Sequence, residues 1–199
     1  MERSALIATQ INLDDPRVKR TRQLLHEAFI SLMMERRFRD ITVQEIADRA
    51  TVNRATFYAH FEDKFDLLDS AIRDRFKQEL AARMPNASVW SEDHLRLLII
   101  IVFECVAMIT HECKPSDRDF APYRERAIQE ETEAILLGWM RQPAFPSAPA
   151  GVAPNTLAMV WSWAIFGAAT QWSRSERRIS ADELARQITL TLLRTIGVW

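Results

Sequence analysis

The stretch TVNRATFYAHFEDK, residues 51–64, decides how the N-terminal part of this chain folds. It carries two phenylalanines, a tyrosine and a histidine, although its flanks have the polar composition of a turn between short helices. Phe57 and Phe61 are four positions apart, so on a helix they share one face and can pack into a small core. Tyr58 and His60 then lie outside that face and can offer donors to a phosphate backbone. The alternative is a hydrophobic corner with no binding role.

Capping residues divide the surrounding sequence into helices. Asp15 and Pro16 supply an N-cap and a first-turn proline, and the helix that they open is expected to run to about Glu35. TVQE, residues 42–45, is a capping box in which the first and last side chains bond each other's backbone amides. Short helices are therefore expected at about 42–50 and at 54–60 with Asn53 as N-cap, and a longer helix at 64–83 with Asp63 as N-cap.

The spacing from Thr42 to His60 is that of a helix-turn-helix: about eight residues of helix, a three-residue turn, then a second helix. Its small core is expected to contain Ile46, Ala50, Val52, Phe57 and Phe61. Helical hairpins that bind no DNA share this spacing. Spacing alone therefore leaves a DNA-binding and a purely structural interpretation open.

The whole chain is predicted to be all-α. Of its 199 residues 48% are hydrophobic and only 4 are glycine, and long apolar runs recur at helical spacing. Pro85 ends the fourth helix, so we expect a flexible arm at 1–15, a helix-turn-helix head at 16–84 and a helical body at 85–199. Body helices are expected near 90–112, 120–141, 155–174 and 181–196, with a proline-rich loop at 143–154.

Charge and cysteine usage limit the partners. Residues 16–64 hold 10 Lys and Arg against 7 Asp and Glu, a net +3 in a chain of net −1, which fits contact with nucleic acid. Cys105 and Cys113 fit neither a disulfide framework nor a zinc signature, so a reduced, cytoplasmic protein without metal is expected. The most apolar run, Leu97–Ile109, is too short to span a bilayer, so no membrane partner is expected.

A longer stretch, FRDITVQEIADRATVNRATFYAHFEDKFDLL at 38–68, resembles the N-terminal domain of TetR/AcrR-family transcriptional regulators. After an aromatic residue that domain typically runs x-x-T-[TV]-x-x-[IL]-A-x-x-A-x-V-[SN]-x-x-[TS]-[FL]-Y-x-[HY]-F-x-x-K-x-x-L-L, and nearly every marked position is filled here. The motif-level resemblance covers about residues 17–80. It implies a ligand-responsive DNA-binding regulator, most often a repressor, in which a small molecule in the body releases the head from its operator.

Two positions depart from the family pattern. Glycine is frequent after the first helix and in the turn, where this chain has Arg37 and Thr51. A left-handed backbone is easy for glycine and costs a β-branched residue on the order of 1–3 kcal/mol. We therefore expect the turn at Thr51 to be a place where the backbone, and with it the tilt of the second helix, can differ.

The predicted recognition helix would read DNA with its first turn. Arg54, Ala55 and Thr56 are expected to face base edges in the major groove, because such a helix enters by its N-terminal end. Arg54 can bond guanine bidentately and Thr56 can contact thymine. For Arg54 the alternative is a solvated charge.

Phosphate contacts are expected around this tip. The resemblance implies that Tyr58 and His60 contact the backbone, although His60 as a neutral helix cap is an alternative. Lys64 in the next helix and Thr42 at the start of the second are further candidates. The start of the first helix is basic, with Arg17, Lys19, Arg20 and Arg22. These side chains either reach the DNA backbone or form a solvated face.

The body contains a candidate pocket for a small-molecule effector. Glu104 and His111, seven residues apart, interrupt one apolar stripe and could orient a ligand. The alternative is that this stripe meets water or an arginine of a neighbouring helix. Aromatic and sulfur side chains could line the same pocket or simply form the core: Phe103, Met108, Trp139, Trp161, Trp163 and Phe166.

Two C-terminal helices are candidates for dimerisation. The helix near 155–174 is apolar nearly all round, with Ala164 and Gly167 among large rings, and can pack closely against a partner. The helix near 181–196 carries an apolar stripe of Leu184, Ile188, Leu192 and Ile196. The resemblance implies that these helices form a four-helix bundle across a twofold axis of a homodimer.

Other classes of function fit less well. The sequence has no nucleophile elbow, phosphate loop or metal-spaced His and Cys cluster, so an enzyme is not expected and no cofactor is predicted. A helical-bundle enzyme and a helical adaptor for protein partners are retained as alternatives. Double-stranded DNA, a second copy of the chain and a small molecule of unknown identity are the expected partners.

Overall fold

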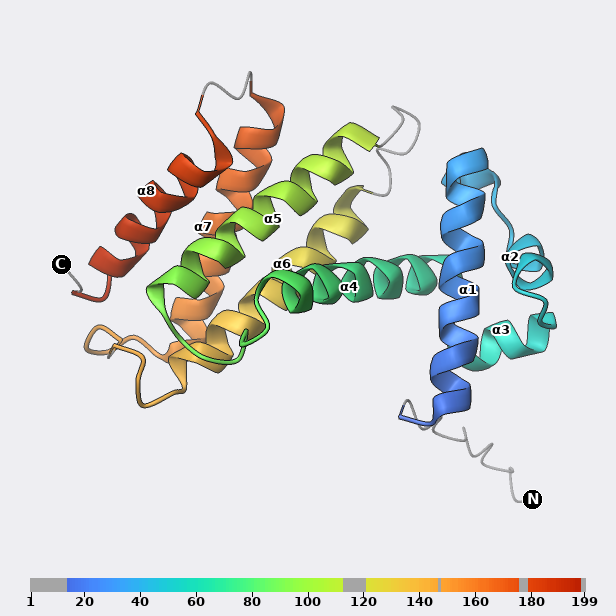
Figure 1. Cartoon of the computed structure of the whole chain (residues 1–199), viewed down its shortest axis with the longest axis horizontal. Coiled ribbons are helices and arrows are strands. Elements are labelled where there is room, and N and C mark those ends of the chain that lie inside the picture. The colour runs from blue at the N-terminus through green and yellow to red at the C-terminus, as the bar shows by residue number, and fades with distance from the viewer. Residues whose placement is uncertain (1–13, 113–120, 147, 176–178, 198–199) are drawn as a thin grey trace, which may run out of the picture. The chain divides into compact units, whose positions relative to one another are not determined.

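A computed structural model describes residues 14–112, 121–146, 148–175 and 179–197. Within these ranges every regular element is helical, so the prediction of an all-α fold is confirmed (Figure 1). The elements are α1 (Pro16–Glu35), the 3-10 helix η1 (Phe38–Asp40), α2 (Val43–Arg49), α3 (Arg54–His60), α4 (Lys64–Arg83), α5 (Glu92–Glu112), α6 (Ala121–Met140), α7 (Pro154–Arg174) and α8 (Ala181–Arg194). No helix of the described part is long and apolar enough to cross a membrane. The predicted arm falls almost entirely outside the described residues.

The predicted helix caps are present. Asp15 accepts a hydrogen bond from the amide of Arg17 at 2.8 Å, directly before Pro16. The capping box of α2 is complete in both directions. Asn53 caps α3, and the Asp63 carboxylate accepts from two amides of the first turn of α4 at 2.8 and 2.9 Å. Local polar side chains thus set the beginnings of all four N-terminal helices.

The first compact unit ends at Leu68. Its core comes from α1, η1, α2, α3 and the start of α4, where Leu67 and Leu68 are buried. The predicted contributions of Ile46, Ala50, Phe57 and Phe61 are confirmed, whereas Val52 is only half-buried. Further buried side chains of the same unit are Leu25, Phe29, Leu32, Phe38 and Ile41. Phe29 meets Phe38 edge-on at 5.9 Å between ring centroids, so α1 is fastened to the corner that precedes α2.

The second compact unit begins at Asp69 and contains the rest of α4 with α5 to α8. Helix α5 is buried over most of its length, in agreement with its apolar sequence on every face. Arg73 bonds Asp69 within α4 and also Glu130 and Glu131 of α6, so an ion-pair cluster joins these two helices.

The boundary between the two compact units lies after Leu68, earlier in the sequence than the boundary between head and body that was expected after residue 84. The reason is that the C-terminal half of α4 supplies Phe76 and Leu80 to the core of the second unit, and Met84, the residue after α4, is buried in the same core. The described residues of the segment at 143–154, which are all but residue 147, contain no helix before Pro154, as the prolines predict. Phe145 is nevertheless buried, with its ring 4.7 Å from that of Trp90.

Candidate nucleic-acid interface and body

Two buried phenylalanines hold the recognition helix α3 against the core of the first compact unit. Phe57 is 0% exposed and Phe61 is 2% exposed. The guanidinium of Arg22, on α1, lies 4.2 Å from the centroid of Phe61 and donates a hydrogen bond to the His60 carbonyl at 3.0 Å. Arg22 therefore ties α1 to the end of α3, a role that its place in a basic run did not indicate.

The turn before α3 keeps the left-handed backbone in spite of its threonine. Thr51 has φ = 58°, and among described residues other than glycine it is the one with positive φ. The amide of Val52 donates to the Ala47 carbonyl at 2.9 Å and that of Thr51 to Asp48 at 3.1 Å. These are the two bonds of a Schellman motif, with Thr51 where glycine is usual. The turn therefore has the left-handed conformation that glycine adopts easily, and the backbone strain falls on Thr51.

The other departure from the family pattern carries no such strain. Arg37 has φ = −77° and ψ = 143°, an extended conformation open to any residue. A side chain is therefore tolerated at this position without cost to the backbone.

The tip of α3 presents polar groups at the surface. Arg54, Ala55 and Tyr58 are exposed, and the Arg54 guanidinium donates to the Tyr58 hydroxyl at 3.1 Å. Asn53 accepts from the amide of Thr56 at 2.6 Å and from its hydroxyl at 3.0 Å. Thr56 thus has its hydroxyl proton directed at the cap and its methyl group and lone pairs left for other contacts.

His60 is half-buried at the end of α3. Its Nδ1 atom is buried and has no hydrogen-bond partner. Burial, followed by the nearby positive charge of Arg22, lowers the pKa of His60 below 6.5. The imidazole is therefore neutral near pH 7.

Lys64 lies in a different environment from the one expected of a phosphate ligand. Its ammonium donates to the carbonyls of Phe38 and Arg39 at 3.0 Å each and to that of Ile41 at 2.8 Å. An ammonium has three protons, so all of its donors are used within the protein. A phosphate oxygen could accept from this ammonium only if it released at least one of the three carbonyls, and the assignment of Lys64 to a phosphate stays a prediction.

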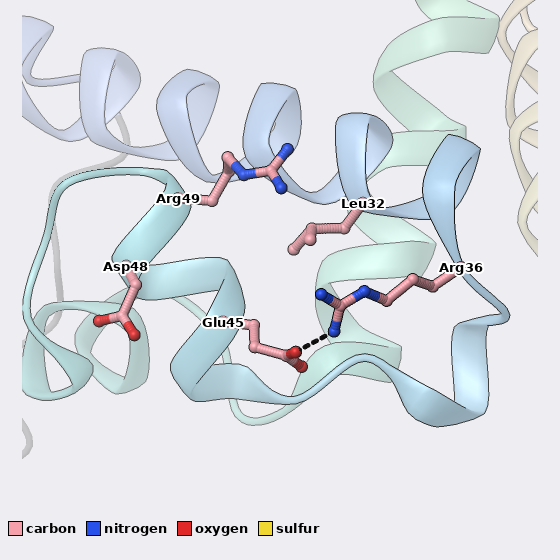
Figure 2. Close-up of a pocket in the computed structure, with 5 residues that line it drawn as sticks. All are labelled: Leu32, Arg36, Glu45, Asp48 and Arg49. Carbon is pink, nitrogen blue, oxygen red and sulfur yellow. Dashed lines mark hydrogen bonds and ion pairs between the residues drawn. The ribbon is translucent and has the colours of Figure 1, made fainter.

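A shallow groove lies between α1 and α2 (Figure 2). Arg36 pairs with Glu45 across it, and Arg49 bonds both carboxylate oxygens of Glu35 at 2.8 and 3.0 Å. Arg49 also donates to the Ser31 hydroxyl at 2.7 Å. Both arginines of the groove are thus neutralised by carboxylates, and they fasten α1 to α2 rather than attracting an anion.

Thr42 stands at the start of α2, beside this groove. Its hydroxyl accepts from the Glu45 amide at 3.2 Å and donates to the Glu45 carboxylate at 2.8 Å, while its own amide donates to the same carboxylate at 2.9 Å. The Thr42 bonds and then Arg36 lower the pKa of Glu45. Thr42 is exposed and held in a fixed orientation.

The predicted pocket residues of the body lie in different environments. Phe103, Trp139 and Phe166 are buried, and the Trp139 indole donates to the Ala87 carbonyl at 2.6 Å. Met108 is half-buried, and the side chain of His111 lies outside the described residues. These rings are core groups that hold the body together.

The predicted ligand role of Glu104 is not supported, since its side chain is 51% exposed and pairs with Arg83 of α4. The alternative that this stripe meets an arginine of a neighbouring helix is the one that the structure has. Trp163 is also on the surface of this chain, at 57% exposure.

One face of α7 is both apolar and exposed. Met159, Val160 and Trp163 are 44%, 52% and 57% exposed, and Ala164 and Gly167 continue the same face. A Cβ atom added at Gly167 would meet nothing within 4 Å of this chain. By contrast, the predicted stripe of α8 packs against the core of its own subunit.

A capped recognition helix on a compact three-helix core, carried by a second helical unit, defines a helix-turn-helix protein. Residues 25–71 match the family described as bacterial regulatory proteins, tetR family. An uncharacterized HTH-type transcriptional regulator, YxbF of Bacillus subtilis (strain 168), is 38% identical over 60 residues, which are 30% of this chain and 16% of that protein.

Solved structures share the fold over most of the chain. The TetR transcriptional regulator from Streptococcus agalactiae 2603V has a TM-score of 0.52 at 21% identity, over 90% of this chain and 97% of the other. Thermus thermophilus FadR, a TetR-family transcriptional repressor in complex with lauroyl-CoA, has a TM-score of 0.50 at 20% identity, over 88% and 94%. The N-terminal part of the chain is thus similar to the tetR family of bacterial regulatory proteins, and the fold over most of the chain is the one seen in these solved structures.

Proposed function

We propose that this protein is a sequence-specific DNA-binding transcriptional regulator that acts as a repressor and is released from its operator by a small molecule. The observation that supports this most directly is α3 itself. Its apolar face is fully buried while the side chains of Arg54 and Ala55 are exposed at its N-terminal turn. A helix fixed in this way can enter the major groove by that end.

The division of labour on this face follows from the chemistry of each group. Arg54 would pair with a guanine, and Ala55 and Thr56 would contact the neighbouring base edges. Tyr58 and neutral His60 are donors at the side of the helix and would bind phosphate oxygens, with Thr42 at the start of α2. When DNA binds, Arg54 would have to leave the Tyr58 hydroxyl, which would free both groups at once.

Homodimerisation is part of the proposal, with α7 as the main contact. The exposed Met159, Val160 and Trp163 give an apolar surface, and Gly167 allows a second helix to approach closely. Two half-sites about 34–36 Å apart would then be read together, which multiplies the affinity of one short recognition helix. The regulator would be a cytoplasmic protein without catalytic activity.

The effector would bind in the body, within reach of α5 to α7. FadR of Thermus thermophilus and FadR of Bacillus subtilis are in complex with lauroyl-CoA and stearoyl-CoA, so acyl thioesters are the first class to screen. A ligand can release the operator only if it binds the DNA-free conformation more tightly. A thermal-shift screen of the dimer would identify such a ligand by a rise in melting temperature.

The test is a binding titration with the DNA upstream of the protein's own gene. We expect a saturable complex whose affinity falls steeply with salt, and Arg54→Ala should lose about 1–3 kcal/mol of discrimination at one base pair. Arg75→Ala is the matched control, because Arg75 is an exposed arginine of α4 that pairs with Glu79. Failure to shift any fragment at low salt would contradict DNA binding and favour the adaptor.

A further inference from the structure

The side of α3 that lies opposite its core contacts carries two alanines. Phe57 and Phe61 are 0% and 2% exposed, so they define the side of α3 that meets the core. A helix turns by about 100° per residue, and Ala59, two positions from each phenylalanine, therefore lies about 200° round the helix from both. Ala55, four residues before Ala59, is on the same side, and both side chains are exposed. The part of α3 farthest from its own core thus consists of methyl groups.

Polar side chains lie along both edges of this side. Arg54 and Tyr58 form one edge, where the guanidinium donates to the phenol at 3.1 Å. Thr56 and His60 form the other edge, and the Thr56 hydroxyl donates to the carbonyl oxygen of Asn53 at 3.0 Å. Small side chains between two polar edges allow the backbone of α3 to approach a surface closely. In a major groove, which is wide enough for one α-helix, that surface is formed by the edges of the bases.

The chemistry of alanine limits which base edge suits this position. A methyl group has no donor or acceptor, so against a polar atom of a base it would displace water without replacing the lost hydrogen bond. Thymine alone among the four bases presents a methyl group, at C5, in the major groove. Contact between two methyl groups removes apolar surface of both from water, which is favourable. Exposed alanines on a recognition helix therefore match thymines.

We propose that Ala59 is a specificity-determining residue, which together with Ala55 selects thymines of each operator half-site by contact with their C5 methyl groups. The inference rests on the proposed DNA-binding function, and it adds a base preference at a residue outside the first turn of α3. The two alanines are one helical turn apart, about 6 Å along the axis, and base pairs are about 3.4 Å apart, so each alanine reaches a different base pair. A half-site then combines the guanine proposed for Arg54 with two thymines.

The first experiment replaces thymines of the operator by uracil. The operator is selected from random duplex DNA with the full-length protein, and each thymine is then exchanged singly before titration. Uracil keeps the hydrogen-bonding groups of thymine and lacks its methyl group. We expect about a fourfold loss of affinity, the equivalent of one buried methyl group, at two thymines of a half-site.

Glycine variants assign each methyl contact to one alanine. In Ala59→Gly the affinity ratio between thymine and uracil should fall to about one at one of the two positions and remain about fourfold at the other. Ala55→Gly should show the converse. Each variant is compared with itself on two DNAs, so a general loss from a less stable helix cancels. Ala82→Gly is the matched control, since Ala82 is an exposed alanine of α4, and it should keep both ratios.

A second measurement needs no variant and covers the case in which the glycine variants do not fold. At each of the two positions the thymine is replaced by cytosine or by 5-methylcytosine, with guanine as the partner base. The methyl group of 5-methylcytosine stands where that of thymine does. We expect the wild-type protein to bind the methylated operator about fourfold more tightly than the unmethylated one.

Three outcomes would overturn the inference. These are half-sites selected without thymine, equal affinity for thymine and uracil at every position, and a ratio that both glycine variants leave unchanged, which would assign the methyl contact to another residue. A wild-type protein that selects no DNA at all would instead contradict the proposed function.

Discussion

Thr51 carries a backbone conformation that a β-branched residue rarely adopts, with φ = 58° in a Schellman turn. Replacing it by glycine removes the clash of its Cβ, worth on the order of 1–3 kcal/mol, and adds chain entropy to the unfolded state, worth about 0.5–1 kcal/mol. We therefore predict that Thr51→Gly raises the free energy of unfolding of the head by about 1 kcal/mol. The measurement is urea unfolding followed by circular dichroism.

The control for this prediction is Thr51→Ala. Alanine keeps the Cβ atom and thus most of the strain, so its stability should lie near that of the wild type. If Thr51→Gly were no more stable than Thr51→Ala, the left-handed strain would not be the quantity that glycine relieves at this turn.

Single residues differ in how well the sequence predicts them. For Thr51, the sequence predicts a strained position at which the backbone can differ. The structure instead keeps the left-handed turn, because the two Schellman hydrogen bonds hold it in place. The roles of Lys64 and Arg22 could not be read from the sequence, since their partners are 23 to 38 residues away. No local pattern encodes a bond over such a separation.

At the scale of one element, α3 depends on its cap. Asn53 accepts from both the amide and the hydroxyl of Thr56, and it fixes the orientation of the turn that would read bases. We predict that Asn53→Ala lowers the free energy of unfolding by about 1 kcal/mol and weakens operator binding, because the first turn of α3 frays. Chemical unfolding and a DNA titration measure the two effects.

Asn53→Asp is the control, since aspartate accepts the same bonds at the same position. Its stability should stay near that of the wild type, although its charge opposes a phosphate. If Asn53→Ala kept wild-type stability, α3 would be held by Phe57 and Phe61 alone.

The capping box of α2 gives the head a pH dependence. The bonds from Thr42 and the charge of Arg36 hold the pKa of Glu45 below 4.5. A carboxylate whose folded-state pKa is depressed contributes stability above its unfolded pKa, and this contribution is lost as pH falls through the folded value. We predict that the stability difference between the wild type and Glu45→Gln narrows as pH is lowered from 6 to below the folded-state pKa.

Glutamine suits this comparison because it can fill the same place in a capping box and does not titrate. Urea midpoints at a series of pH values measure the difference, and Thr42→Ser, which keeps the hydroxyl, should follow the wild type. A difference that is the same at every pH would contradict a stabilising role for the ionised carboxylate.

Elements were predicted best where a local rule applies. The caps at Asp15, Thr42, Asn53 and Asp63 were all identified, because each bonds an amide two or three residues ahead. The body was predicted less well at its side chains. Helix α7 is apolar nearly all round, and such a pattern does not reveal which side meets its own subunit, so exposed Trp163 and buried Trp161 could not be told apart.

At the scale of the whole molecule, the apolar face of α7 with Met159, Val160 and Trp163 is left exposed by the described part of the chain. We predict that Trp163→Asp converts a dimer into a monomer in light scattering, because a charge would replace the largest exposed ring on that face. Val89→Asp is the matched control, since Val89 is 53% exposed and lies outside α7. It should leave the dimer intact.

The same variant links assembly to DNA binding. A monomer holds one recognition helix, so Trp163→Asp should lose the affinity that two half-sites provide together and bind a half-site and a full operator about equally. Circular dichroism should show an unchanged helix content, because the side chain of Trp163 is mostly outside the core of its own chain. A Trp163→Asp protein that still sediments as a dimer would move the interface away from this face of α7, and one that is monomeric yet prefers the full operator would show that dimers form on the DNA.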